Sequence, residues 1–252
     1  MSGAAPEADA ASGAERVALY RRLPLVESDR WWADLARRSP DGRVLELGAG
    51  AGRLTTAFLD AGAEVTAVER DPGMLSALRD RVGGRARLLG CDAAELPPLE
   101  PFGLVALPTS LLNELPDAAA RHAVLAGAAA ACRPDGRIAL HLLGPWWLAD
   151  LPAHVTGRLQ PGDGTAPIEV TVTAGPFDAW SGRRRAELTY RFPDGRRLRD
   201  HLDAAAVTGT ELELTLAAVG CEIEDRFGPA PPDTGPRQDD AAWHVVCRPR
   251  AG

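Results

Sequence analysis

Three acidic residues are spaced along the first half of the chain so that they could hold the polar groups of a nucleoside. Glu46 and Glu69 each end an apolar run and Asp92 follows a third, and each lies 23 positions after the one before it. A carboxylate accepts hydrogen bonds from both hydroxyls of a ribose, and another can accept from an exocyclic amine such as that of adenine. One such residue is typical of a solvated loop, but three at successive strand ends favour a ligand site.

A glycine-rich turn follows the first of these carboxylates. Gly48, Gly50 and Gly52 alternate with alanine after the apolar run 44–47, and a helical pattern begins at Leu54. A strand, a tight turn and a helix N-terminus bring backbone N–H groups and the helix dipole to a ligand, and glycine lets the backbone approach closely. The sequence therefore predicts ligand binding at this turn.

The spacing excludes two common phosphate-binding motifs. A dinucleotide fingerprint requires a third glycine where this chain has Arg53. A P-loop ends in lysine followed by serine or threonine, and the chain contains no lysine. Glu46 would also repel a phosphate that approached the turn. The absence of lysine further excludes catalysis through a lysine Schiff base.

The composition indicates an acidic globular protein with a single sizeable core. The 252 residues are 45% hydrophobic and carry a net charge of −7, which argues against non-specific binding to nucleic acid. The run of arginines at 183–185 is too short to neutralise many phosphates. The four cysteines have no C-x-x-C spacing and predict neither a zinc site nor a disulfide framework.

The start and the hydropathy of the chain predict a cytoplasmic protein. Residues 1–13 have neither the basic start nor the apolar core of a signal peptide, and we expect them to form a disordered tail. No apolar run reaches the length that spans a bilayer. Scattered cysteines suit a reducing compartment.

Apolar runs and helical patterns alternate through the first half of the chain, which predicts an α/β fold with a doubly wound, mostly parallel sheet. The expected strands are residues 43–47, 64–68, 86–89, 102–107 and 137–143. The expected helices between them are residues 54–61, 71–82 and 117–132. Ligands of such sheets bind at the carboxyl ends of the strands, where the glycine turn and the three carboxylates lie.

The pattern changes after the fifth strand. Alternating polar and apolar residues, with a Pro-Asp-Gly turn at 193–195, predict an antiparallel insertion that forms a lid or a dimer surface. Thr208 and Glu211 have the spacing of a capping box that opens a last helix. Strands are expected at residues 168–173, 186–191, 198–202, 221–227 and 243–248. The predicted units are a tail (1–13), an N-terminal helical cap (14–38), a core (39–150), the insertion (151–206) and a closing helix with two strands (207–252).

Four motifs resemble those of the class I S-adenosylmethionine (SAM)-dependent methyltransferases. They are E-L-G-A-G-A-G (46–52), D-P-G-M-L (71–75), L-P-T-S-L-L-N (107–113) and the turn R-P-D-G (133–136). The third motif looks like that of the small-molecule branch, which includes bacterial natural-product enzymes. It lacks the Asn/Asp-Pro-Pro-aromatic box of enzymes that methylate amines of nucleic acids. The resemblance implies a seven-stranded Rossmann-like sheet that ends in an antiparallel strand pair.

The resemblance also implies SAM as the cofactor and S-adenosylhomocysteine (SAH) as its product. By it, Glu46 and the glycines line the methionine end of SAM, Glu69 holds the ribose and Asp92 the adenine amine. Met74 and Leu107 would enclose the base. The full set of implied cofactor-binding residues is Tyr20, Glu46, Gly48, Ala49, Gly50, Glu69, Arg70, Met74, Cys91, Asp92, Ala93, Leu107 and Thr109.

Catalytic and substrate-binding groups are less clearly marked. Methyl transfer needs mainly alignment and, for some acceptors, removal of a proton. His141, at the carboxyl end of the fifth strand, is the candidate base, although a hydrogen-bonded structural histidine fits the same position. Candidates for substrate binding are Asn113, Trp146, Trp147 and His201, and core packing would suit the tryptophans equally. No pattern suggests a metal ion.

These features together predict SAM-dependent transfer of a methyl group to an oxygen, nitrogen or carbon atom of a small molecule, in bacterial secondary metabolism. We expect a monomer or homodimer without nucleic-acid or membrane partners. Two alternatives stay open: a SAM-binding protein used for a non-methylating reaction or a structural role, and a protein methyltransferase. A nicotinamide oxidoreductase is disfavoured by Glu46 and Arg53.

Overall fold

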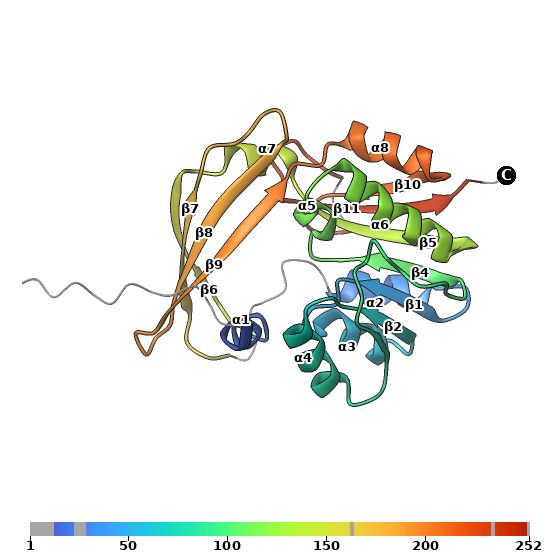
Figure 1. The fold of residues 1–252 in the computed structure, drawn as a ribbon, viewed down its shortest axis with the longest axis horizontal. Coiled ribbons are helices and arrows are strands. Elements are labelled where there is room, and N and C mark those ends of the chain that lie inside the picture. Colours follow the sequence, from blue (N-terminus) through green and yellow to red (C-terminus); the bar gives the residue numbers. More distant parts are fainter. Residues whose placement is uncertain (1–12, 23–28, 162–163, 233–234, 251–252) are drawn as a thin grey trace, which may run out of the picture.

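A seven-stranded sheet forms the centre of the protein (Figure 1). The computed structural model describes residues 13–22, 29–161, 164–232 and 235–250, so the expected N-terminal tail lies almost wholly outside the described residues. The strand order is β10-β11-β5-β4-β1-β2-β3, and only β11 runs against its neighbours. The strands are β1 (Arg43–Leu47), β2 (Glu64–Val68), β3 (Arg87–Leu89), β4 (Phe102–Leu107), β5 (Cys132–Leu143), β10 (Cys221–Phe227) and β11 (Ala242–Pro249). The predicted α/β fold with a mostly parallel sheet is confirmed.

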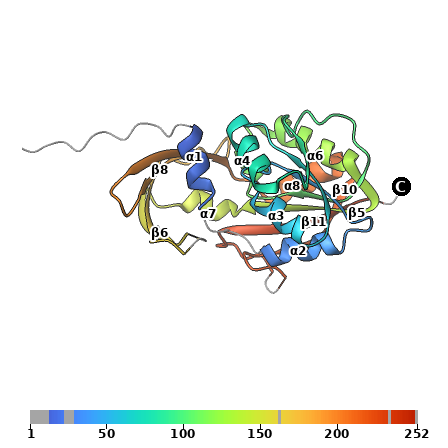
Figure 2. The ribbon, with the colours of Figure 1, turned by 90° about the horizontal axis from the view of Figure 1, so that it is seen from below.

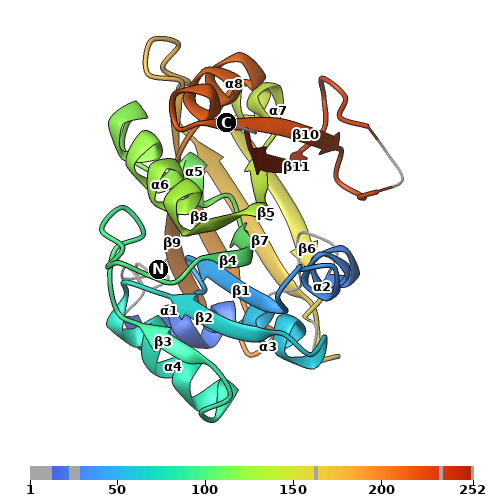
Figure 3. The same cartoon turned by 90° about the vertical axis from the view of Figure 1, so that its right-hand side faces the viewer.

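Helices cover both faces of this sheet (Figure 3). One face carries α2 (Asp29–Arg37), α3 (Arg53–Asp60) and α4 (Pro72–Val82), and the other carries α6 (Ala118–Ala131) and α8 (Gly209–Ala218). Trp32 and Phe58 fill the first interface, and Leu125 and Leu212 lie in the second. Every residue of β4 is buried, as expected for a central strand of a parallel sheet.

The helix starts follow the capping residues that the sequence offers. The Asp71 side chain accepts a hydrogen bond from the Met74 amide at 2.8 Å, which fixes the start of α4. Thr208 accepts from the Glu211 amide at 3.2 Å, as a capping box predicts. Glu211, however, forms an ion pair with Arg121 of α6 at 2.8 Å. Its carboxylate therefore ties α8 to α6.

A second, four-stranded antiparallel sheet stands beside the first (Figure 1). Its strands, in spatial order, are β6 (His154–Leu159), β7 (Ile168–Ala174), β8 (Arg183–Arg191) and β9 (Arg197–Ala205). The short helix α7 (Pro145–Asp150) connects it to β5, and α5 (Leu111–Glu114) contacts the end of β9. The predicted antiparallel insertion is confirmed, with β6 as an additional strand. Its function as a separate unit stays a prediction.

The N-terminal helix α1 (Gly13–Tyr20) lies between the second sheet and α4 (Figures 1 and 2). Its Leu19 packs against Tyr190 and Leu198 of the second sheet, and Val17 packs against Met74 of α4. The sequence predicted one helical cap over residues 14–38. The structure has two helices, α1 and α2, and the stretch around Pro24 lies outside the described residues.

The R-P-D-G segment at 133–136 is not the predicted turn but part of β5. Cys132 pairs with Phe102 of β4, and the register shifts before Leu104 pairs with Arg137. The segment therefore stays extended along β4 through an irregularity. Gly136 permits this close approach, because a Cβ there would lie 2.9 Å from the Gly103 carbonyl oxygen.

His141 is a core residue and does not reach the carboxyl-end cavity. Ile138 and Leu140 on β5 face α6 and α8, and alternation along the strand turns His141 toward α2. Its ring lies 5.0 Å from that of His244 on β11, and only 2% of its surface is exposed. Burial, with a smaller contribution from His244, lowers the pKa of His141 to about 3. The expected role as a catalytic base is therefore not supported by its position.

This histidine pair should make the protein sensitive to mild acid. In the unfolded chain each imidazole takes up a proton near pH 6.5, whereas burial lowers the pKa values of His141 and His244 in the folded state. The free energy of unfolding should therefore fall as the pH drops below about 6.5, by up to about 1.4 kcal/mol per pH unit for each histidine. Urea denaturation between pH 7.5 and 5.0 measures the slope. His141→Leu should flatten it, and His122→Gln, at an exposed position of α6, should not; equal slopes in both variants would contradict the assignment.

The third glycine of the turn should stabilise the fold through close packing as well as through its backbone conformation. Gly52 has a φ of +81°, and a Cβ there would lie 2.4 Å from Cδ1 of the fully buried Leu78 of α4. Gly52→Ala should therefore lower the free energy of unfolding by about 2–4 kcal/mol. Gly42→Ala, with a φ of +69° and open space around the new atom, should show only the conformational part, about 1–2 kcal/mol. Similar losses in the two variants, measured by urea denaturation, would disprove the packing role.

Candidate functional site

A cavity of about 350 Å³ lies at the carboxyl ends of β1, β2 and β4. This volume is in the usual range of small-molecule sites, roughly 300–1,000 Å³. The wall is formed by α1, by the glycine turn and by the loops that follow the strands. The lining residues are Arg16, Tyr20, Glu46, Gly48, Ala49, Gly50, Ala51, Arg53, Leu54, Val68, Glu69, Arg70, Asp71, Met74, Cys91, Asp92, Ala93, Pro108, Thr109, Leu111, Glu114 and Leu115.

The structure brings together all the predicted cofactor-binding residues except Leu107. Leu107 is the last residue of β4 and packs in the core on the α6 and α8 side, because side chains alternate along the strand. Pro108, Leu111 and Leu115 supply the apolar wall at this end of β4 instead. That the gathered residues bind a cofactor stays a prediction.

Glu69 joins the glycine turn to the end of β2. One carboxylate oxygen accepts a hydrogen bond from the Gly50 amide and the other from the Asp71 amide, each at 2.8 Å. The side chain is buried, with 9% of its surface exposed, and lines the cavity. Each carboxylate oxygen has two lone pairs, so Glu69 keeps acceptor capacity for a diol in the cavity.

Glu46 is held at the end of β1 by a neighbouring helix. Its carboxylate accepts a hydrogen bond from the Thr55 hydroxyl of α3 at 2.5 Å, and both residues are buried. Arg53, at the start of the same helix, also lines the cavity. The end of β1 therefore places a carboxylate and a guanidinium at one wall.

Asp92 is fixed after β3 by two donors. Its oxygens accept from the Ala94 amide and from the Arg70 guanidinium, both at 2.9 Å. The Ala94 hydrogen bond, with help from Arg70, lowers the pKa of Asp92 below its usual range, so that the carboxyl is ionised at neutral pH. Arg70 follows β2, so this ion pair bridges the ends of two adjacent strands.

The loop after β4 has an unusual backbone that the sequence did not predict. Thr109 and Ser110 have φ values of +55° and +56°, a left-handed conformation that is uncommon for residues other than glycine. Such strain is found at functional sites, where the surrounding structure maintains it. Thr109 lines the cavity.

Asn113 holds this loop in place from the protein interior and does not face the cavity. It is fully buried, donates to the Ala205 carbonyl at 2.8 Å and accepts from the Leu143 amide at 2.9 Å. These bonds connect α5 to β9 and to the end of β5. The sequence prediction that Asn113 contacts substrate is therefore replaced by a positioning role.

Four charged residues of the cavity wall were not among the predicted site residues: Arg16, Arg53, Asp71 and Glu114. Of these, Arg16 and Glu114 were not singled out in the sequence at all. Arg16 comes from α1, and its guanidinium carbon lies 5.6 Å from the ring centroid of Tyr20. Glu114 ends α5, lines the cavity and is exposed to solvent; partial desolvation by the surrounding atoms raises the pKa of its carboxyl against the opposing effect of Arg16. Neither residue belongs to a motif, so their spacing in the sequence gave no signal.

The remaining predicted substrate residues lie away from the cavity lining. Trp146 is 58% exposed on α7, whereas Trp147 packs against the cluster that contains Leu151 and Ala174. His201 is exposed on β9, on the side of the second sheet that faces away from α1. The tryptophans were expected at the site because they follow β5, and His201 because its hairpin could face the pocket. Helix packing and strand alternation direct them elsewhere.

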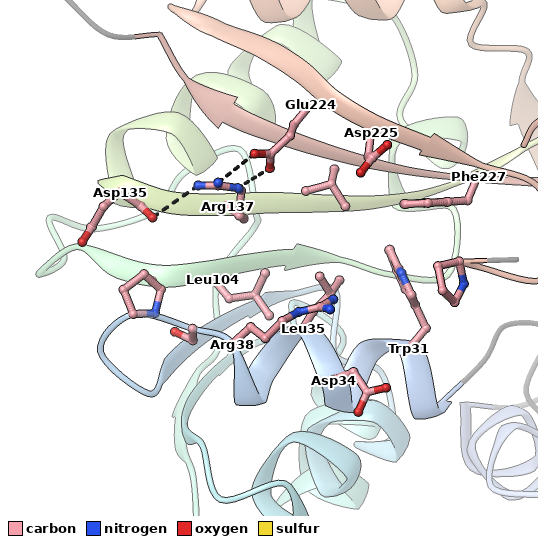
Figure 4. Close-up of a pocket in the computed structure, with 15 residues that line it drawn as sticks. Trp31, Asp34, Leu35, Arg38, Leu104, Asp135, Arg137, Glu224, Asp225 and Phe227 are labelled. Atoms are coloured by element: carbon pink, nitrogen blue, oxygen red, sulfur yellow. Dashed lines mark hydrogen bonds and ion pairs between the residues drawn. The ribbon is translucent and has the colours of Figure 1, made fainter.

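A second cavity, of about 470 Å³, lies between α2 and the amino-terminal parts of β4 and β5 (Figure 4). Arg137 forms two hydrogen bonds with the Glu224 carboxylate there, and Trp31 and Phe227 form one end. The wall contains none of the predicted site residues. Within the described residues, moreover, no group of His, Cys, Asp and Glu is arranged to hold a metal ion, and no helix is long and apolar enough to cross a membrane.

Comparison with protein families identifies the segment around the first cavity. A family model described as "Methyltransferase domain" matches residues 44–136. This stretch contains the glycine turn and the three strand-end carboxylates. The match thus coincides with the residues that surround most of the cavity.

Among curated proteins, the chain is similar to ribosomal RNA small subunit methyltransferase A of Anaeromyxobacter sp. (strain K). The two are 39% identical over 127 residues, which are 50% of this chain and 35% of that protein. The chain therefore spans about a third of the length of the curated relative that it matches.

Solved methyltransferases have the same fold over nearly the whole chain. The CcbJ methyltransferase of Streptomyces caelestis is 19% identical, with a TM-score of 0.78 over 95% of this chain and 98% of that one. SAM-bound CalS10 of Micromonospora echinaspora, an amino pentose methyltransferase of calicheamicin biosynthesis, is 21% identical, with a TM-score of 0.67 over 94% and 92%. Residues 44–136 thus match a methyltransferase domain, and the chain has the fold of these enzymes.

Proposed function

We propose that the protein binds SAM in the carboxyl-end cavity and transfers its methyl group to a small molecule. The observation that carries this proposal is the convergence of Glu46, Glu69 and Asp92, from the ends of three successive strands, on one cavity beside the glycine turn. Their arrangement suits a ligand that presents a diol and an exocyclic amine at separate positions.

The polar and apolar residues that line the cavity fit the separate groups of SAM. Glu69 has lone pairs left for the ribose hydroxyls after it has accepted two backbone amides. Asp92 is ionised and suits the adenine amine, with Met74, Cys91 and Ala93 as apolar surroundings. Glu46, Arg53 and the glycine turn suit the ammonium and carboxylate of the methionine part. When bound, SAM supplies a methyl group on a positively charged sulfur, and the protein aligns the acceptor for in-line transfer.

A small-molecule acceptor is favoured over nucleic acid. CalS10, which shares the fold, acts on an amino pentose by its description, and the antiparallel sheet here stands next to the cavity in the same chain. The similarity to the ribosomal RNA enzyme covers half of this chain. The net charge of −7 gives little support for phosphate binding. A natural-product pathway, a bacterial source and a cytoplasmic location belong to this proposal.

Two measurements test the assignment. Calorimetric titration with SAM, SAH and NAD should give micromolar binding of the first two and none of NAD. Release of SAH in the presence of candidate acceptors then separates a methyltransferase from a protein that binds SAM without transferring the methyl group. Binding of NAD alone, or of none of the three, would overturn the proposal.

Glu69→Gln provides the sharpest residue-level test. The amide keeps one acceptor oxygen but loses the charge, so SAM affinity should fall by about 1–3 kcal/mol, or roughly 5- to 150-fold in Kd. Glu64→Gln is the matched control, because Glu64 begins the same strand with a side chain that is 77% exposed. Unchanged SAM affinity in Glu69→Gln, or an equal loss in the control, would remove Glu69 from the site.

A further inference from the structure

The second sheet presents one apolar face toward α1, which we call the inner face. Its position is fixed by Leu198 and Tyr190, which pair across β9 and β8 and both pack against Leu19. Residues that are directly paired, or two apart along a strand, share a face. The inner face therefore includes Val170, Leu188, Tyr190, Leu198, Asp200 and Leu202.

Asp200 is the acidic residue of that group. It lies between Leu198 and Leu202 along β9 and opposite Leu188 on β8. A carboxylate among apolar neighbours is costly unless it is hydrogen-bonded. Asp200 accepts from the Tyr20 hydroxyl at 3.3 Å and from the His201 amide at 2.9 Å. Neither partner carries a positive charge, so these two hydrogen bonds do not neutralise the carboxylate.

Asp200 is connected to the methyltransferase cavity through Tyr20. The tyrosine lines that cavity and donates a hydrogen bond to Asp200. The Asp200 carboxylate therefore does not line the cavity itself but contacts a residue that does. Glu114 lines the same cavity directly, from α5. Two carboxylates, one on α5 and one on the second sheet, therefore approach the cavity on the side of α1.

Hydrogen bonds and an ion pair hold in place the elements that carry these two carboxylates, α5 and β9. Asn113 anchors α5 to β9, as described above. Arg183 of β8 donates to the carbonyl oxygens of Leu115 and Pro116, each at 2.8 Å, directly after α5. The same arginine forms an ion pair with Asp203 of β9 at 2.8 Å. Glu114 and the strand that carries Asp200 are thus held to each other.

The charges on this side of the cavity do not cancel. Arg16 is the positively charged residue that α1 contributes to the cavity wall, and it interacts electrostatically with Glu114 and Asp200. The pKa of Glu114 is raised, first by partial desolvation and further by Asp200, while Arg16 and Arg70 oppose the rise. Because Arg70 is already paired with Asp92, two carboxylates lie beside the one guanidinium of α1, which leaves an excess of negative charge where an acceptor would approach.

We propose that Glu114 and Asp200, the latter through Tyr20, form the acceptor subsite, and that the acceptor is an amine which binds as its ammonium ion. This inference rests on the proposed function. An ammonium ion can donate a hydrogen bond to Glu114 and another to the Tyr20 hydroxyl oxygen, and its charge is attracted by both carboxylates. A phosphate or carboxylate acceptor would be repelled, and a neutral hydroxyl would leave the charge uncompensated. The apolar residues around Asp200 suit a carbon skeleton next to that amine.

The amine must lose one proton before it reacts. R–NH3⁺ gives that proton to a carboxylate, for which Glu114 is suited because its raised pKa brings it closer to neutral pH, and the proton passes on to water. The lone pair of the resulting R–NH2 forms the new N–CH3 bond as the S–CH3 bond breaks and its electron pair stays on sulfur. The products are SAH and R–NH2–CH3⁺, so atoms and charge balance.

Sinefungin is the probe for this subsite. It is a SAM analogue that carries an amine in place of the transferable methyl group, so its ammonium points toward the acceptor position. SAH has neither the methyl group nor the amine. The ratio of the SAH Kd to the sinefungin Kd, measured by calorimetry, therefore reports the interaction of an ammonium ion with the subsite, independently of the rest of the cofactor.

The ratio of the SAH Kd to the sinefungin Kd should fall about 10- to 100-fold in Asp200→Asn and in Glu114→Gln, with the Kd of SAH nearly unchanged. Glu187→Gln is the matched control. It removes the same charge from the same sheet on the opposite face, next to Leu188 in sequence and paired with His201 across the strands, and should leave the ratio as in the wild type.

The outcomes separate the two proposals. Failure of the wild-type protein to bind SAH would overturn the proposed function and this inference together. Wild-type binding of SAH with a ratio that stays unchanged in both Asp200→Asn and Glu114→Gln would overturn the amine subsite alone. A ratio that falls equally in Glu187→Gln would also overturn it, because a general change of charge would then explain the effect. Retained SAH binding in each variant shows that it is folded.

Discussion

The carboxylate of Glu69 holds the ligand-binding half of the large sheet together. It accepts the amides of Gly50 and Asp71, so one side chain fixes the glycine turn and the start of α4 relative to the end of β2. Because the residue is buried, these bonds are shielded from water and their loss would leave polar groups unsatisfied. The same turn is also tied to β2 by the amides of Gly48 and Ala49, which donate to the Val68 carbonyl at 2.9 and 3.0 Å.

The other side of the cavity depends on α5, a single helical turn shared by the two sheets. Asn113 connects it to β9 and β5, and Arg183 connects β8 to the residues that follow it. These bonds account for the persistence of two left-handed residues, Thr109 and Ser110, directly before the helix. The walls proposed for the cofactor and for the acceptor are therefore positioned by different means: strand ends on one side, and buried side-chain hydrogen bonds on the other.

Local patterns predicted most of the large sheet and of the cavity. β1, β2, β4 and β10 have the predicted bounds, because each is an apolar or alternating run between turn residues. The strand-end carboxylates were predictable because chain order alone brings the carboxyl ends of parallel strands together. The errors concern contacts between distant segments. Pairing with β11 decided the environment of His141, packing decided those of Leu107 and Asn113, and only the position of α1 brings Arg16 to the same cavity as Glu114.

The division of the cavity wall between chain segments also has an evolutionary consequence. The glycine turn and the strand-end carboxylates lie within residues 44–136, whereas α1 and the second sheet lie outside that stretch. Substitutions on the inner face can alter the environment of the acceptor without touching a single strand of the large sheet. Gene duplicates of such a protein can diverge in substrate choice while their nucleoside-binding residues stay under unchanged selection, and sequence similarity in the first half then says little about which acceptor each copy uses.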